Sequence, residues 1–514
     1  MLFPTITFAI FFLIVFVGNW LLMPRPGLWK PFILLASVVF YGWWEWRFVV
    51  LLAFSALLNW LFAVAIARAG TAASRKWLLV AAVAADLGVL GWFKYYGFFI
   101  TSAVNFLHVF GLDADIALLR VVLPVGISFL TFRVLTYVID VYRGTLRTAS
   151  LIDFAVYVSF FPYIMAGPIA RASEFLPQLV SPRDPRRVDT ARAFFLIVAG
   201  LAKKMLLADY LATHIVNGVF TTPGQYTSLE VFFGIVGYSV QIYCDFSAYS
   251  DIAIGISLLL GFELPENFNA PYTAVSVQDF WRRWHMTLSR WLRDYLYIPL
   301  GGNRKGRRRT YVNIMITMLL GGLWHGAGWP FVFWGGLHGA AQVVEHRRVD
   351  RRRRQAERFR RRSAALDGED TGDLGVAGVA ADATAGAAMA ASHGPLEYDR
   401  RPWRGKVWPR LGVFAYVTFA WVFFRSPTFG AALSVLARLF QSWGGIGGAV
   451  TPALLLVIAL GIGVQYVPRT VYERTEAGFS ALNPALQGVV LAAGFMLLDV
   501  LGPSGPASFL YFRF

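Results

Sequence analysis

Charged residues are scarce in this sequence of 514 residues. They make up 15% of the chain, whereas hydrophobic residues make up 57% and aromatic residues 16%. This balance is too apolar for a soluble chain of this length, because a soluble protein needs more charge on its surface. The composition therefore excludes an ordinary soluble globular protein and predicts a membrane protein.

Cysteine is almost absent. The single residue, Cys244, excludes an intramolecular disulfide framework and a metal site built from several cysteines. The seven histidines form no H-E-x-x-H or comparable cluster, so no metal site is expected. The chain also lacks a G-x-S-x-G elbow and a G-x-x-x-x-G-K-[ST] loop. We therefore expect no bound cofactor, and the chemistry must come from side chains or from a diffusible donor.

Long apolar runs are present along the whole chain. Residues 5–23, 48–67, 77–93 and 453–467 approach or reach the roughly 20 residues that cross ~30 Å of hydrocarbon. Counting similar runs predicts an all-α polytopic membrane protein with about eleven to fourteen hydrophobic segments, some of them short or re-entrant. The first run has no charged region before it and no cleavage site of small residues before Arg25, so we expect it to remain as a span.

The positive charge predicts an orientation in the membrane. The formal net charge is +17, and in a polytopic chain basic residues gather in cytoplasmic loops. Basic residues follow the run 5–23 and the run 48–67, which is the third along the chain, and this places the N-terminus in the periplasm; these residues are Arg25, Lys30, Arg68, Arg75 and Lys76. No recognition module accompanies the arginines, so contact with anionic lipid is expected and binding of nucleic acid is not.

A charged segment divides the chain. The strongly basic residues 345–362 are followed by a stretch, 363–394, that is rich in Ala, Gly and Asp and has no periodic apolar face. We interpret 347–405 as a cytoplasmic linker, basic and then disordered, because such a composition buries too little apolar surface to fold. The linker separates a membrane body, 1–346, from a C-terminal group of transmembrane segments, 406–514.

Residues 243–346 differ from the simple apolar runs, because charge, tryptophan and glycine are interspersed among short apolar stretches. Ionisable residues at membrane depth are costly and usually face a protein interior or a water-filled cavity. Four residues at helical spacing share one face, while Arg282 and Arg283 lie mainly elsewhere; the four are Trp281, Trp284, His285 and Leu288. The pattern predicts an interfacial or re-entrant amphipathic helix.

Several motifs carry a resemblance to a known family. The stretches "FWRRWHMTLSRWLRDYLYIPLGGNRKG" (280–306) and "GGLWHGAGWPFVFWGGLHG" (321–339) resemble the membrane-bound O-acyltransferase family, and within it the group that serves bacterial alginate O-acetylation. Further matches occur in order at 123–144, 161–171 and 243–272. The resemblance weakens through the C-terminal spans, and the insertion at 347–405 departs from the family pattern.

The resemblance implies two catalytic residues. The family's nearly universal histidine falls on His325, and its usual second polar position falls on His285. Transfer of an acyl group to a hydroxyl needs a base, and an apolar setting favours the neutral imidazole that can accept a proton. Trp324, Trp329 and Trp284 are expected to shape a pocket for the acyl group.

Structural interpretations of the histidines remain open. Without the resemblance, His325 reads as a histidine that is hydrogen-bonded between helices. His285 could position His325, line the path of the donor or bind a backbone carbonyl. His338, in "GGLHGAA", repeats the glycine and histidine pattern of the first motif, but packing between helices explains it as well as chemistry does.

The resemblance also implies a donor, a partner and a location. The expected donor is acetyl-coenzyme A in the cytoplasm, with Arg304, Lys305 and Arg307 binding its phosphates, although lipid contact would also explain these residues. The protein is expected in a bacterial inner membrane, with His325 in a central channel and a periplasmic acetyltransferase partner that completes transfer to an exported polysaccharide. Two alternatives stay open: D-alanyl or peptidoglycan acyl transfer by the same site, and a lipid or glycan transporter without chemistry. No internal repeat of a transporter is visible.

Overall fold

The computed structural model is helical and describes residues 1–112, 119, 121–368, 403–445, 447–502 and 509–510. No strand occurs in these ranges. The helices are α1 (Ile6–Leu22), α2 (Pro26–Gly42), α3 (Arg47–Arg68), α4 (Ala72–Leu90), α5 (Tyr96–Val109), α6 (Ile127–Arg143), α7 (Leu151–Ser159), α8 (Ala172–Phe175), α9 (Thr190–Ala202), α10 (Asn217–Thr221), α11 (Ser228–Leu259), α12 (Val277–Arg283), α13 (Met286–Leu292), α14 (Gly306–His325), α15 (Trp329–Gly368), α17 (Trp403–Arg425), α18 (Phe429–Arg438), α19 (Pro452–Gly463), α20 (Arg469–Ser480) and α21 (Pro484–Leu501). The predicted all-α class is confirmed.

Local sequence sets where several helices begin. Thr227 and Glu230 form a capping box at the start of α11, in which each side chain satisfies a backbone N–H of the first turn. Thr5 and Asn483 cap α1 and α21 in a similar way, through one side-chain oxygen each. A π-helical turn, Gly91–Tyr95, joins α4 to α5, and such turns often mark functional sites.

Among the described residues, five helices are long and apolar enough to cross a membrane: Arg47–Arg68, Ala72–Val109, Ser228–Leu259, Gly405–Arg425 and Pro484–Leu501. A sixth candidate is the pair Pro452–Tyr466 and Arg469–Ser480, which is bent by 92°. Shorter apolar helices, α1, α2 and α18, account for more of the predicted segments. Other predicted apolar segments fall in helices such as α6, in which the buried residues Arg133 and Asp140 lower the mean hydropathy.

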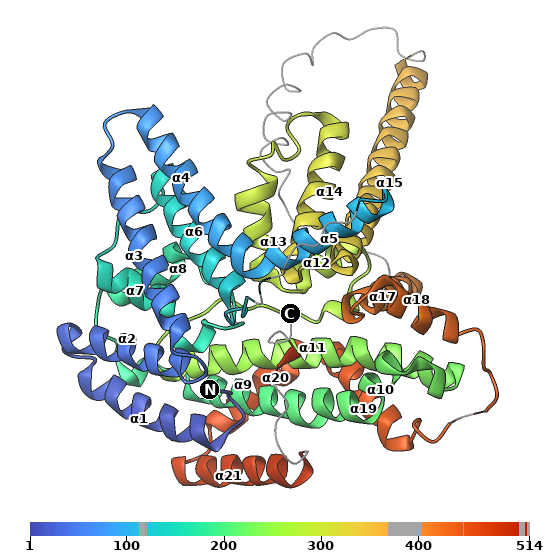
Figure 1. Cartoon of the computed structure of the whole chain (residues 1–514). Helices are drawn as coiled ribbons and strands as arrows, with labels where there is room; N and C mark the ends of the chain where they lie inside the picture. The colour runs from blue at the N-terminus through green and yellow to red at the C-terminus, as the bar shows by residue number, and fades with distance from the viewer. Residues whose placement is uncertain (113–118, 120, 369–402, 446, 503–508, 511–514) are drawn as a thin grey trace.

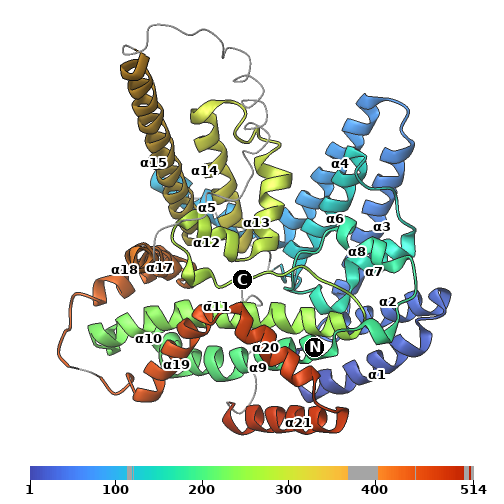
Figure 2. The ribbon, with the colours of Figure 1, turned by 180° about the vertical axis from the view of Figure 1, so that it is seen from behind.

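The helices form two large hydrophobic cores that share α11, and a third, small cluster contains Leu90, Tyr95 and Ile127. The first core is built mainly from residues 1–179 and the second mainly from 208–458. Helix α11 supplies Tyr249 to the first core and Phe246 to the second. In both views α3, α4 and α6 stand on one side, α14 and α15 stand on the other, and α9 and α11 lie side by side beneath them (Figures 1 and 2). The junction of the two cores is where the site lies.

Glycines allow α14 and α15 to pack closely as a hairpin. A Cβ atom on Gly322 would lie 2.2 Å from the carbonyl oxygen of Phe331, and one on Gly335 would lie 2.2 Å from that of Met318. No side chain larger than hydrogen fits at either position. The hairpin rises from the body in Figure 1, and residues 347–368, which include most of the basic stretch, continue α15 as helix. Residues 369–402, which hold most of the predicted linker, lie outside the described residues.

The predicted amphipathic helix around His285 is not continuous. It breaks between Trp284 and His285, and His285 adopts a left-handed conformation with φ 43° between α12 and α13. The backbone N–H of Met286 donates to the carbonyl oxygen of Asn267 instead of continuing a helix, at 2.9 Å. Helical periodicity could not reveal this break, because the competing acceptor comes from a distant loop. The four residues of the predicted face are nonetheless buried: Trp281, Trp284, His285 and Leu288.

Candidate functional site

His325 is the last residue of α14, and its side chain is buried, with 4% exposed. Aromatic rings of both cores surround it. Its ring centre lies 4.9 Å from that of Trp324 in the first core, and 5.2 Å from those of Trp334 and Phe424 in the second. The ring of His285 is 6.5 Å away. The structure thus brings the two predicted catalytic residues together at the junction of the cores.

The carboxyl end of α14 is held by residues that sequence reasoning missed. Lys94 Nζ donates to the carbonyl oxygens of Trp324 at 2.6 Å and His325 at 3.2 Å, and to Ser128 Oγ at 3.1 Å. The hydroxyl of Tyr95 donates to the carbonyl of Leu323 at 3.0 Å. These are carbonyls of the last turn, which lack partners within the helix and attract cations. Lys94 was detectable as a lone lysine within an apolar run, "GWFKYYGFF".

His285 is fully buried and has one hydrogen-bonding partner. Its Nδ1 lies 3.1 Å from Oδ1 of Asn267, and its Nε2 has no hydrogen-bond partner among the described residues. The ring packs between Phe246, at 4.7 Å, and Phe129, at 6.3 Å between ring centres. The side chain is thus fixed at one nitrogen, while the other can receive a ligand's hydrogen.

Burial keeps both histidines neutral. They lie outside the candidate spans, and burial lowers the pKa of His285 to about 3. The pKa of His325 is held well below its usual range, first by burial and then by its ionisable neighbours His285, Lys94 and His338. A charged imidazole is disfavoured in such surroundings because it loses its hydration. The neutral form is the one that can accept a proton.

The three predicted pocket tryptophans occupy different places. Trp324 contacts His325 and stacks on Phe132, with ring centres 5.1 Å apart. Trp284 is buried in the second core, and its ring centre lies 5.0 Å from that of Trp421. Trp329 begins α15 outside the cluster around His325: it is 55% exposed, and its indole N–H donates to Ser102 Oγ at 3.2 Å.

His338 is buried among aromatic rings of the second core, and one of its ring nitrogens has a hydrogen-bond partner. The indole N–H of Trp281 donates to its Nδ1 at 3.2 Å, so Nδ1 is the acceptor and the neutral ring carries its hydrogen on Nε2. Its ring centre is 4.8 Å from that of Trp334, which also contacts His325. His338 therefore lies beside the ring of Trp334, and its hydrogen is on Nε2, whereas a base acting through Nε2 would carry its hydrogen on Nδ1.

The predicted phosphate-binding residues Arg304, Lys305 and Arg307 are exposed at the start of α14. His325 ends the same helix, so about 27 Å of helix separates Arg307 from it. The cations and the histidines are thus not brought together.

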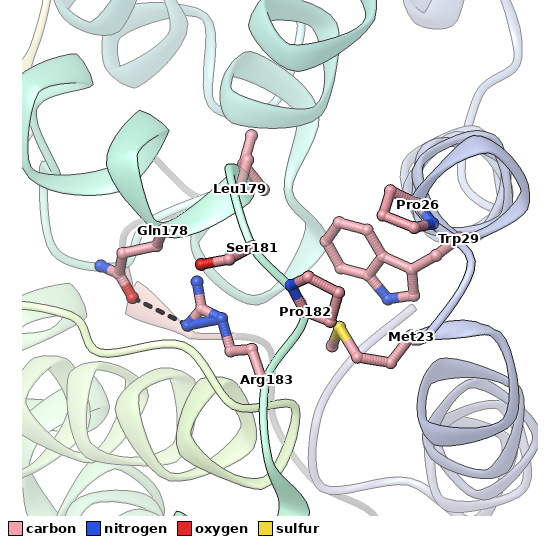
Figure 3. Close-up of a pocket in the computed structure, with 8 residues that line it drawn as sticks. All are labelled: Met23, Pro26, Trp29, Gln178, Leu179, Ser181, Pro182 and Arg183. Carbon is pink, nitrogen blue, oxygen red and sulfur yellow. Dashed lines mark hydrogen bonds between the residues drawn. The ribbon is translucent and has the colours of Figure 1, made fainter.

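A small pocket lies away from the histidines, between the α1–α2 turn and the segment after α8 (Figure 3). Its empty volume is about 210 Å³, and its lining includes Met23, Trp29 and Arg183. The guanidinium of Arg183 donates to the carbonyl of Gly261 and to Gln178, and it lies over the ring of Phe262. With its arginine engaged and no histidine in its lining, this pocket does not offer a base.

Metal ligands are not gathered in the described ranges: no group of three or more His, Cys, Asp or Glu residues there could hold a metal ion. The described part of the site therefore consists of two neutral histidines, aromatic rings and the amine of Lys94. Such a set can move a proton and surround an apolar acyl group.

Comparisons with known proteins match this region to a family. Residues 127–366, which include His285, His325 and His338, match the family described as MBOAT, membrane-bound O-acyltransferase family. The chain is 42% identical to the probable alginate O-acetylase AlgI of Pseudomonas putida over 352 residues, covering 67% of this chain and 70% of that protein. It is 42% identical to the corresponding protein of Azotobacter vinelandii, covering 67% and 68%. It is also 33% identical to the peptidoglycan O-acetyltransferase of Helicobacter pylori over 467 residues, covering 85% and 79%.

Proposed function

Because the chain belongs to the membrane-bound O-acyltransferase family, we propose that it moves acetyl groups from a cytoplasmic thioester, acetyl-coenzyme A, across the inner membrane for O-acetylation of an exported polysaccharide such as alginate. The family makes it a multi-pass membrane enzyme. The observation that carries the finer proposal is the pair of buried histidines, His285 and His325, whose rings lie 6.5 Å apart. A periplasmic acetyltransferase partner completes the transfer to the polymer.

The proposed reaction uses His325 as the general base. Its imidazole removes the proton of the acceptor hydroxyl while the oxygen attacks the carbonyl carbon of the thioester. The carbon–sulfur bond then breaks, and the imidazolium returns its proton to the departing thiolate. No proton is gained or lost overall. The base must be neutral at the start, which is consistent with its buried surroundings.

The backbone around His325 supports the same assignment. Lys94 and Tyr95 together fix three carbonyls at the end of α14. A base that is held in one place needs less reorganisation as the reaction proceeds. The channel that would lead donor and acceptor to His325 remains a prediction.

Peptidoglycan is the second candidate acceptor. The H. pylori relative aligns with 85% of this chain, more than the 67% aligned with the alginate O-acetylases. A transporter without chemistry is disfavoured, because the family is one of enzymes. Acetate release from purified alginate and from purified peptidoglycan, compared between cells with and without this protein, tests the acceptor. Unchanged acetylation of both polymers would contradict the proposal.

Neutralising the basic cluster is expected to weaken donor binding. Replacing Arg304, Lys305 and Arg307 together by glutamine should raise the acetyl-coenzyme A concentration needed for half-maximal transfer in reconstituted membranes, because phosphates are bound by such cations. The matched control replaces Arg186 and Arg187, which are exposed elsewhere. If the half-maximal concentration is unchanged and only membrane abundance falls, the cluster is a topological anchor instead.

The arginine distribution predicts a periplasmic N-terminus and a cytoplasmic segment after α15. A phosphatase fused within 363–394 should be inactive, because phosphatase reporters fold only in the periplasm, and a fluorescent protein fused at the same point should be bright. An active phosphatase together with a dark fluorescent protein would reverse the orientation and would place the basic cluster away from cytoplasmic acetyl-coenzyme A.

A further inference from the structure

The loop before α12 supplies a side chain that decides where the proton on His285 lies. Asn267 is 1% exposed, and its Oδ1 lies 3.1 Å from Nδ1 of His285. The same oxygen accepts from the backbone N–H of Thr287 at 3.3 Å and from its hydroxyl at 2.8 Å. The amide nitrogen of Asn267 donates to Ser250 Oγ at 3.1 Å. Both ends of the amide are thus engaged in the buried interior.

These contacts fix the orientation of the amide. A backbone N–H can only donate, so the atom that faces the N–H of Thr287 must be the oxygen of Asn267. The hydroxyl of Thr287 accepts from the backbone N–H of Ile169 at 3.0 Å, which leaves its own hydrogen to point at the same oxygen. The neutral ring of His285 therefore carries its hydrogen on Nδ1, and its Nε2 holds a bare lone pair.

Two further features mark His285 as more than a packing residue. Its Nε2 is buried without a hydrogen-bond partner among the described residues, and an unsatisfied buried acceptor costs stability. Its backbone also adopts φ 43°, a conformation that is costly for a residue other than glycine and that often occurs at functional sites. The separation of 6.5 Å from the ring of His325 is too long for a direct hydrogen bond between the two rings.

We propose that Asn267 is a positioning residue that locks His285 in this tautomer, so that Nε2 accepts a hydrogen bond from a second hydroxyl group of the acyl acceptor, next to the hydroxyl whose proton His325 removes. The acceptor class is then a polyol with neighbouring hydroxyl groups, as a sugar offers. This inference rests on the proposed function. It adds that His285 recognises a hydroxyl group of the acceptor and that Asn267 fixes the tautomer that His285 needs for this.

The test compares Asn267→Ala with Asn267→Asp in reconstituted membranes that also contain the periplasmic partner. Labelled acetyl-coenzyme A is the donor, and label bound to the polymer is the readout. The alanine variant should lose about 10²-fold in transfer, the scale expected when a reacting group is misplaced. The same loss is expected for His285→Ala, and the double variant should lose no more than either single variant. The aspartate variant should keep most of the rate, because a carboxylate oxygen still accepts from Nδ1.

The pH profile separates positioning from simple structural support. The carboxylate in Asn267→Asp favours the charged imidazolium of His285 and so raises the pKa of His285. As the pH is lowered, the transfer rate of this variant should therefore begin to fall at a higher pH than that of the wild type. A structural role alone would not move the profile. This comparison decides the matter even if Asn267→Ala does not fold. An aspartate variant that is folded and inactive, or additive losses in the double variant, would overturn the inference.

Failure of this inference can be told apart from failure of the proposed function. If His325→Ala abolishes transfer while both Asn267 variants behave as the wild type, the acyltransferase proposal stands and the role of Asn267 is wrong. If His325→Ala keeps full transfer, the proposed chemistry itself is wrong.

Discussion

Replacement of His325 by alanine should nearly abolish acetyl transfer, with a loss of about 10²–10⁴-fold, the range that a general base contributes. The expected reason is that the acceptor hydroxyl keeps its proton and remains a poor nucleophile. The measurement is polymer-bound acetyl in cells at matched membrane abundance, together with transfer from labelled acetyl-coenzyme A in reconstituted membranes. His214→Ala, at an exposed histidine outside the site, is the matched control and should keep full transfer.

A second substitution separates the chemistry from packing. His325→Gln keeps hydrogen-bonding capacity but loses the titratable nitrogen, so it should be almost as inactive as the alanine variant. Wild-type transfer in this variant would make His325 a packing residue. Because the pKa of His325 is lowered by burial, the wild-type enzyme should also keep its rate from about pH 8 down to about pH 6, where an unperturbed histidine begins to gain a proton.

The sequence predicted the fold class but not which segments cross the membrane by themselves. The apolar run at 48–67 became α3, one of the five candidate spans. Helix α6 behaves differently: Arg133 is 1% exposed and donates to the carbonyls of Tyr163 and Ile164 at 2.9 Å. A charged residue can lie inside such a body because other helices, rather than lipid, surround it. Counting apolar runs cannot distinguish a helix covered by protein from one covered by lipid.

The candidate site was predicted in part. His325 and His285 were identified through the family resemblance, and the structure places their rings together. Asn267 was missed, because its contact with His285 depends on a break in the backbone at His285 that local periodicity does not encode. Lys94 was missed although a lone lysine in an apolar run is a recognised signal. Its partners lie 230 and 231 residues away in the sequence, so its task became visible only in three dimensions.

A buried charge cluster next to α11 also went unpredicted, and it leads to the second large expected effect. Lys204 Nζ lies 2.8 Å from Oδ1 of Asp209 and 2.7 Å from Oδ1 of Asp245, and these three side chains are at most 4% exposed. The other oxygen of Asp245 accepts from the backbone N–H of Leu510 at 2.7 Å. One ammonium thus joins the π-helical turn Lys203–Asp209 to the candidate span α11, and Asp245 connects both to the end of the described chain.

Lys204→Met should therefore destabilise the folded protein by about 3–5 kcal/mol, because removing one partner of a buried ion pair leaves charge uncompensated in the interior. Thermal unfolding in detergent and membrane abundance are the measurements. Lys203→Met is the matched control. Lys203 pairs with Asp251, but these side chains are 14% and 24% exposed, so water can compensate part of the loss and the effect should be clearly smaller.

Neutralising the partners provides the decisive comparison. In a variant that combines Lys204→Met with Asp209→Asn and Asp245→Asn, no buried charge of the cluster remains, so a large part of the lost stability should return. The amide that replaces the carboxylate of Asp245 in that variant would still offer an oxygen to the N–H of Leu510. If the triple variant is no more stable than Lys204→Met alone, the cluster acts through the geometry of its hydrogen bonds rather than through compensation of charge. If Lys204→Met is as stable as the wild type, water or lipid headgroups reach the carboxylates, and α11 is less deeply enclosed than its packing against α9 indicates.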